Sequence, residues 1–122
     1  MEVRELTIMV GTDQIEAMTR FYGETLGLER VAKFRDPVFE AAGGFIRLLD
    51  HSEISGPTLE PARMQINLFV DDVSSEFRRV VSADPDVRIH RRPERESWGG
   101  EVATLLDPDG NFVQLLELIA DE

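Results

Sequence analysis

An internal repeat is the feature that most constrains how this chain folds. Residues 44–50, GFIRLLD, can be aligned with residues 111–117, NFVQLLE, so that Phe45 matches Phe112. A second alignment matches Thr7 with Gln65, near the start of each half. Because a repeated sequence builds a repeated structural unit, the chain is predicted to contain two modules with the same order of elements.

Each half has the pattern of one strand, one helix and three further strands. Alternating apolar residues predict strands at 3–10, 28–35, 37–42 and 45–50, and again at 63–71, 87–91, 102–107 and 111–119. Helical spacing predicts helices over 14–26 and from residue 73. Residues 51–62 carry Ser, Gly and Pro without periodicity, which is typical of a linker. We expect a single domain over residues 1–122, with module one at about 1–50 and module two at about 63–119.

Local signals mark the ends of these elements. Thr12 and Asp13 are candidate N-caps of the first helix, and Asp13 followed by Glu16 has the pattern of a capping box. Asp72 is a typical N-cap for the second helix. Residues 43–44, both Gly, are predicted to form a two-residue hairpin turn. Residues 107–110, DPDG, are predicted to form a tight turn that leads into the last strand.

Composition excludes several classes of function. The net charge of −11 leaves no generally basic surface of the kind that binds nucleic-acid phosphates. The chain has no cysteine, and no apolar run approaches the ~20 residues of a membrane-spanning helix. The first residues, MEVREL, lack the pattern of a signal peptide. We therefore expect a cytoplasmic protein that binds neither nucleic acid nor membrane.

Four short motifs give the repeat a family resemblance. They are FYGETLG at 21–27, LFVDDV at 68–73, WGG at 98–100 and DPDGN at 107–111. In this order, on a repeated βαβββ module, they resemble the vicinal oxygen chelate superfamily of glyoxalase I, extradiol dioxygenases and bleomycin-resistance proteins. The resemblance implies an α+β fold in which two βαβββ modules form an open eight-stranded barrel-like sheet around a cavity, with helices on the outer face. It also implies a homodimer, which would cover the edge strands of such a sheet.

The resemblance further places four residues where metal-using members hold their ligands. These residues are Thr7, Arg47, Gln65 and Gln114. Hydroxyl and amide groups are weak neutral ligands, and a guanidinium is always charged and only donates hydrogen bonds. We therefore predict no bound metal and no cofactor. The two histidines, His51 and His90, are expected at the surface.

Strand periodicity indicates the same positions by a separate route. Alternation predicts that one face of each first strand packs under a helix, namely Leu6, Ile8 and Val10, and Met64, Ile66, Leu68 and Val70. The opposite faces would then line a cavity, with Trp98 at one end. This apolar lining with a few polar groups is the predicted ligand-binding site and consists of Thr7, Met9, Phe45, Arg47, Leu49, Gln65, Asn67, Phe69, Trp98, Phe112, Gln114 and Leu116. A plain hydrophobic core is the alternative interpretation of the aromatic residues.

Arg47 and the segment of residues 88–95 carry positive charge that needs a partner. Arg47 would be costly inside a barrel unless it is paired, and an internal ion pair, with Glu40 as a candidate, is favoured over a ligand carboxylate or phosphate. Residues 88–95, RIHRRPER, form a basic island that could bind anions. The alternative for this island is a solvated strand edge protected from aggregation by its charge.

These observations favour a protein that binds a small organic molecule without a catalytic metal. The alternative within the same superfamily is a metal-dependent lyase, isomerase or dioxygenase, which needs ligands that the matched positions lack. A metal-free enzyme is a third hypothesis, with Glu40, Tyr22 or His90 as general acid or base. No paired and environment-tuned groups in the sequence identify catalytic residues.

Overall fold

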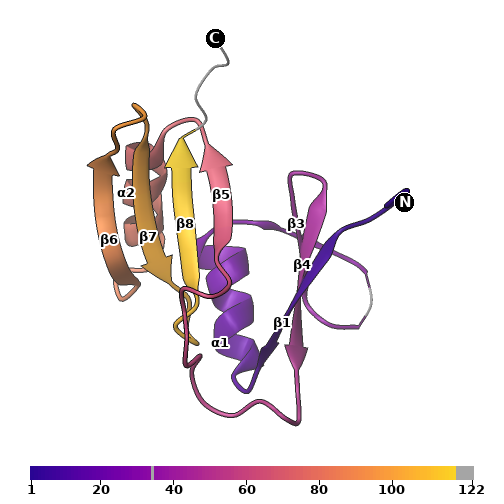
Figure 1. Ribbon diagram of the computed structural model, residues 1–122. Helices are drawn as coiled ribbons and strands as arrows, with labels where there is room; N and C mark the ends of the chain where they lie inside the picture. Colours follow the sequence, from indigo (N-terminus) through magenta and orange to yellow (C-terminus); the bar gives the residue numbers. More distant parts are fainter. Residues whose placement is uncertain (34, 118–122) are drawn as a thin grey trace. The chain divides into compact units, whose positions relative to one another are not determined.

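The sequence repeat is a repeat of structure. The computed structural model describes residues 1–33 and 35–117 (Figure 1). The chain divides into two compact units, Met1–Pro57 and Thr58–Glu122. Each unit contains one four-stranded sheet and one helical segment.

The first unit runs strand, helix, strand, strand, strand. Its elements are β1 (Thr7–Thr12), α1 (Ile15–Arg20), the π-helical segment η1 (Phe21–Thr25), β2 (Glu29–Val31), β3 (Val38–Ala41) and β4 (Gly44–Asp50). The strand order in the sheet is β1-β4-β3-β2. Strand β1 runs parallel to β4, and the other neighbours are antiparallel.

The second unit repeats this order and topology. Its elements are β5 (Ile66–Val70), α2 (Val73–Ala83), β6 (Arg88–Arg95), β7 (Glu101–Leu106) and β8 (Phe112–Glu117). The strand order is β5-β8-β7-β6, with β5 parallel to β8. The predicted α+β fold of two βαβββ modules is confirmed, and its eight strands form two four-stranded sheets that are not closed into a barrel. The predicted end of the last strand, near residue 119, lies outside the described residues.

In each unit the helix packs on one face of its sheet, because alternate strand residues are apolar. Ile46 and Leu48 of β4 are buried on the face that carries α1. Val113 and Leu115 of β8 are buried on the face that carries α2. The opposite faces, which carry no helix of their own unit, are called here the first open face and the second open face.

Three residues expected under the helices are instead exposed, and Ile8, at 36%, is the least exposed of them. Leu6 is 64% exposed and Met64 is 74% exposed. Both precede their strands, since β1 begins at Thr7 and β5 begins at Ile66. Alternation therefore placed the starts of these two strands too early.

The two helices begin in different ways. Asp72 caps α2 as predicted, because its carboxylate accepts a hydrogen bond from the Ser75 N–H at 3.0 Å. The predicted capping box at Asp13 is wrong. Helix α1 starts one residue later than expected, after Gln14, and the Asp13 carboxylate accepts a hydrogen bond from the Gly56 N–H at 2.8 Å.

Glycine residues with positive φ lie in both of the turns that were predicted between neighbouring strands. The first turn consists of Ala42 and Gly43, one residue earlier than expected, because Ala41 pairs with Gly44 across the hairpin. Both central residues have positive φ, 51° and 81°, as a type I′ turn requires.

The second turn is organised by Asp107, which is fully buried. Its carboxylate accepts hydrogen bonds from the Asp109 N–H at 3.0 Å, the Asn111 N–H at 2.9 Å and the Asn111 side-chain amide at 2.8 Å. Gly110 takes the positive φ of 86° that closes the turn. The predicted turn at residues 107–110 is therefore confirmed.

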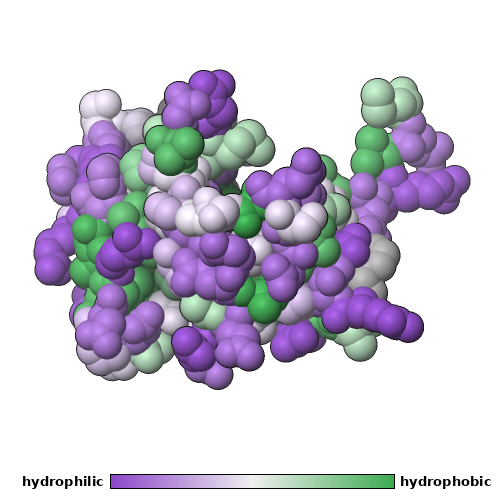
Figure 2. All heavy atoms as spheres, turned by 90° about the horizontal axis from the view of Figure 1, so that it is seen from below, coloured by the Kyte–Doolittle hydropathy of each residue, from purple (hydrophilic) through white to green (hydrophobic). Residues whose placement is uncertain are grey.

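The segment between the modules is hydrogen-bonded at both ends. His51 donates its N–H to the Thr12 carbonyl within the first unit. Thr58 donates its N–H to the Asp109 carbonyl within the second unit. Hydrophilic residues dominate the face of the molecule in Figure 2, and hydrophobic residues occupy separate patches. Among the described helices, none has the length and apolar character needed to cross a bilayer.

Candidate functional site

A row of polar side chains crosses the second open face. Asn67 on β5 lies opposite Gln114 on β8, and Gln114 lies opposite Thr104 on β7. Thr104 in turn lies opposite Arg91 on β6. Paired residues on neighbouring strands project to the same side of a sheet. The register therefore aligns four hydrogen-bonding groups across all four strands.

Gln114 is the centre of a hydrogen-bonded amide cluster on this face. Its Nε2 donates to Asn67 Oδ1 at 3.0 Å and to Gln65 Oε1 at 2.5 Å. Its Oε1 accepts from the Thr104 hydroxyl at 3.4 Å. The Gln65 Nε2 donates to the Ala62 carbonyl at 3.1 Å. These contacts hold the Gln114 amide in one orientation, and three predicted site residues are thereby brought together.

Apolar and aromatic groups flank the polar row. Phe112 and Leu116 lie on either side of Gln114 on β8, at alternate positions that share its face. Phe69 on β5 lies opposite Leu116 and is 55% exposed. The ring of His90 lies 4.5 Å from the ring of Phe112, centroid to centroid. The second open face thus combines exposed ring surface with oriented amides, as ligand sites commonly do.

Trp98, expected to close one end of the cavity, lies in the turn between β6 and β7 and is 44% exposed. Its ring packs against Gly100, where an added Cβ would come within 2.2 Å of the indole. Gly100 therefore makes room for the indole within this turn.

The basic island is structural. Strand β6 extends to Arg95, four residues beyond the end of the strand that was predicted at 87–91. Each of its four arginines has a partner within the unit. Arg88 donates hydrogen bonds to the carbonyls of residues 107 and 108, and Arg95 donates one to the Gly99 carbonyl. Arg91 forms ion pairs with Glu94 and Glu96. The Arg92 guanidinium lies over the Phe77 ring. The hydrogen bond with Glu96 raises the pKa of Arg91.

Five predicted site residues lie on the first open face. Thr7 lies opposite Phe45 and Met9 lies opposite Arg47 in the parallel pair of β1 and β4, with Leu49 two residues further along β4. Arg47 is paired, as expected for a charge at this position, but with Asp36 and not with Glu40. The Arg47 Nε donates to Asp36 Oδ2 at 2.8 Å.

A second charged pair borders the same face. The Lys33 ammonium lies 2.5 Å from a Glu5 carboxylate oxygen and 4.8 Å from the centre of the Phe45 ring. The Thr7 hydroxyl donates to Glu5 at 3.0 Å. These hydrogen bonds, that of Lys33 first, lower the pKa of Glu5. Arg47 and Lys33 on the first open face are thus each matched by a carboxylate.

The four residues at the family's ligand positions do not fit a divalent metal. The Arg47 guanidinium is cationic and is hydrogen-bonded to Asp36. Gln65 and Gln114 are neutral amides that hydrogen-bond to each other, and the Thr7 hydroxyl donates to Glu5. Within residues 1–33 and 35–117, no group of three or more His, Asp or Glu side chains is arranged to hold a metal ion. We therefore derive no chemistry that proceeds through a metal.

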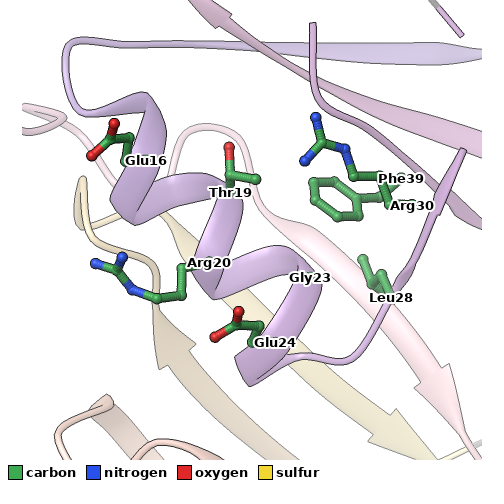
Figure 3. A pocket seen from close by; sticks show the side chains of 8 residues that line it. All are labelled: Glu16, Thr19, Arg20, Gly23, Glu24, Leu28, Arg30 and Phe39. Atoms are coloured by element: carbon green, nitrogen blue, oxygen red, sulfur yellow. The ribbon is translucent and has the colours of Figure 1, made fainter. Parts of the chain in front are cut away.

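A separate groove of about 410 Å³ lies on the helical side of the first unit (Figure 3). Figure 3 shows Phe39 and Arg30 opposite Thr19 and Gly23 of the helical segment. Gly23 packs closely there, because an added Cβ would lie 3.0 Å from the Phe39 ring. None of the predicted lining residues borders this groove. Apart from the glycine in the FYGETLG motif, no sequence pattern indicated this groove.

Comparison with known proteins agrees with this architecture. A sequence profile described as the Glyoxalase/Bleomycin resistance protein/Dioxygenase superfamily matches residues 6–115. No curated protein sequence matches the chain.

Solved structures share the fold along nearly the whole chain. A protein of unknown function from Agrobacterium tumefaciens str. C58 is 24% identical, with a TM-score of 0.77, over 98% of this chain and 97% of that one. Lactoylglutathione lyase from Agrobacterium tumefaciens is 21% identical, with a TM-score of 0.71, over 96% and 95%. TioX from Micromonospora sp. ML1 is 13% identical, with a TM-score of 0.75, over 96% and 100%. At these identities the similarity concerns the fold alone.

Proposed function

This chain belongs to the glyoxalase/bleomycin resistance protein/dioxygenase superfamily, and from that premise we propose that it binds a small organic molecule without a catalytic metal. We expect the twelve predicted lining residues to contribute to ligand binding. The proposal concerns binding, and it assigns no catalytic residue.

The observation that carries this proposal is the amide cluster around Gln114. At a position where metal-using relatives are expected to hold a ligand, this chain has an amide that is oriented by Gln65, Asn67 and Thr104. An oriented amide on an exposed, partly aromatic face is suited to hydrogen-bond a ligand. It is poorly suited to hold a divalent cation.

The cluster also favours one kind of ligand. The Asn67 side chain accepts from Gln114, and its own Nδ2 donates no hydrogen bond within the described residues. Two N–H groups therefore remain for an acceptor such as a carbonyl oxygen. The cations Arg47 and Lys33 on the first open face are already matched, by Asp36 and by Glu5. A neutral, partly aromatic molecule with a carbonyl group fits these features.

The test is a binding screen monitored by NMR, with neutral aromatic amides, aromatic carboxylates and aromatic amines as probes. We expect the neutral amides to bind and to shift the side-chain amide signals of Gln65, Asn67 and Gln114. The variant Gln114→Met should weaken this binding at least fivefold, because it keeps the length of the side chain but removes the amide. Gln14→Met, outside the site, is the matched control and should bind as the parent protein does.

Two results would contradict the proposal. One is the absence of binding by every probe class. The other is binding that is unaffected by Gln114→Met.

The alternative function, that of a metal-dependent lyase, isomerase or dioxygenase, is tested by a separate experiment. Protein purified without a metal-affinity tag would be dialysed against nickel, zinc, iron or manganese and its metal content measured. We expect far less than one metal ion per chain, because the matched positions offer amides, a hydroxyl and a guanidinium. One tightly held ion per chain would make the metal enzyme the better description.

We also propose that the protein forms a homodimer. Strands β1 and β5 are sheet edges and expose large apolar side chains on or next to them, among them Ile8, Met9, Met64 and Phe69. Such edges are commonly covered by a partner. Light scattering should give twice the chain mass, and a monomer at micromolar concentration would refute this proposal. The cytosol remains the expected compartment.

A further inference from the structure

Strand β6 contains one hydrogen-bonding side chain that the fold does not use. Its four arginines all contact groups of the same unit, as described above. Within the described part of the chain, neither ring nitrogen of His90 has a hydrogen-bond partner, and the residue is exposed. His90 therefore differs from every other polar side chain in the centre of this strand.

A register shift accounts for the position of the His90 side chain. Ile89 pairs with Leu105, but Arg91 pairs with Thr104, so His90 is the extra residue of a β-bulge. A bulge can redirect a side chain relative to the regular alternation of a strand. The His90 ring contacts Phe112 on β8, which is separated from β6 by β7. The two side chains therefore meet over β7, and the imidazole lies on the second open face with Phe112.

The contact with Phe112 holds the ring but leaves its edge free. The ring planes are tilted by 33°, with their centres 4.5 Å apart. This arrangement uses the face of the imidazole and leaves both nitrogens, on its edge, available. Phe112 is two residues from Gln114 on the same face, so the ring pair and the amide cluster share the second open face.

We infer that His90 is a specificity-determining residue of the proposed site, which hydrogen-bonds a second polar atom of the ligand while the amide cluster binds the first. This inference rests on the proposed function and adds a requirement to it. The ligand would be a neutral aromatic molecule with two separated hydrogen-bonding groups. Phe112 would act as the positioning residue that keeps the imidazole over the face.

Two probes that differ in one atom test the inference. Isonicotinamide carries a carboxamide and a ring nitrogen at opposite ends, whereas benzamide lacks the ring nitrogen. Titrations would be followed by NMR at pH 7.5, with the side-chain amides of Gln114 and Asn67 and the ring protons of His90 as reporters. We expect isonicotinamide to bind about fivefold more tightly than benzamide, which is the effect of one neutral hydrogen bond.

The variants separate the hydrogen bond from the ring contact. His90→Phe keeps an aromatic ring against Phe112 and removes both nitrogens, so it should bind the two probes equally. His51→Phe, the same change at the other histidine of the chain, should preserve the fivefold preference. Because His90 is exposed, the backbone spectrum of His90→Phe should overlay that of the parent protein outside β6 and β8.

The outcomes distinguish this inference from the proposed function. If His90→Phe keeps the preference while Gln114→Met abolishes binding, the site stands and the role of His90 is refuted. If the parent protein binds both probes equally, the second hydrogen bond does not exist. If neither probe shifts Gln114 or His90 at tens of millimolar, the inference fails together with this choice of ligand class.

Discussion

The guanidinium of Arg47 is hydrogen-bonded to the carboxylate of Asp36, with the Nε atom 2.8 Å from Oδ2. The two side chains are 25% and 26% exposed. The ion pair neutralises the one charged side chain that β4 places on the first open face. Asp36 immediately precedes Pro37 and β3, the strand next to β4, so it approaches Arg47 from a neighbouring part of the sheet.

A double-mutant cycle should detect this pair. We expect Asp36→Asn and Arg47→Met to be coupled by roughly 0.5–1 kcal/mol, a modest value because both groups are partly solvated and screened by salt. The measurement is urea denaturation followed by far-ultraviolet circular dichroism at low and high ionic strength. Glu40→Gln combined with Arg47→Met is the control and should show no coupling. Equal coupling in both cycles would mean that Asp36 has no special role.

Asp107 should be a major determinant of stability in the second unit. Replacing it with Ala leaves two backbone N–H groups and one side-chain amide without their buried acceptor, and we expect a loss of roughly 2–4 kcal/mol. Asp107→Asn keeps one carbonyl oxygen and should lose less. The chain has a single tryptophan, Trp98, so its fluorescence during urea denaturation reports this unit. An Ala variant as stable as the parent would show that water replaces the carboxylate.

A substitution in the hairpin turn of the first unit should stabilise that unit. Ala42 has a φ of 51°, which costs an ordinary L-residue about 1 kcal/mol. Asn tolerates this conformation, and Asn-Gly is the preferred type I′ sequence, so Ala42→Asn should stabilise the unit by about 0.5–1 kcal/mol. Ala42→Val should do the opposite, because a β-branched residue resists positive φ. Hydrogen exchange of the β3 and β4 amides measures both changes, and identical protection in the two variants would argue against this turn type.

The cap of α2 should make stability depend on pH in the acid range. The Ser75 backbone N–H, and then the Ser75 hydroxyl, lower the pKa of Asp72 from its ordinary value of 3.8. A carboxyl whose pKa is lowered by folding stabilises the protein above its unfolded pKa, and this contribution is lost as the pH falls through the folded value. Asp72→Asn caps without titrating and is the reference. The urea midpoint of the parent protein should fall relative to this variant as the pH decreases below about 4. Parallel curves would contradict the assignment.

Some details of the fold followed from local chemistry and others did not. The Asp72 cap and the turn at residues 107–110 were predicted correctly because their signals lie within a few residues of each other. The predicted capping box at Asp13 and the predicted hairpin turn at residues 43–44 were wrong. Asp13 is bonded to Gly56, far along the chain, and the hairpin turn is fixed by which residues pair across it. Neither relationship is visible in a short window of sequence.

The sequence by itself determined the two βαβββ modules and the alternation of faces along the last strand of each module. Alternation of apolar residues and the repeat from residue 45 to residue 112 are enough for that, since side chains on a strand alternate with a period of two. It also indicated Gln65, Asn67 and Gln114 as members of one face. Only the tertiary structure decided which groups meet. Register across β5, β8 and β7 joined the amides into one cluster, and a bulge in β6 brought His90 onto Phe112. Register and bulges depend on pairing between distant strands, so no local pattern could have specified these contacts.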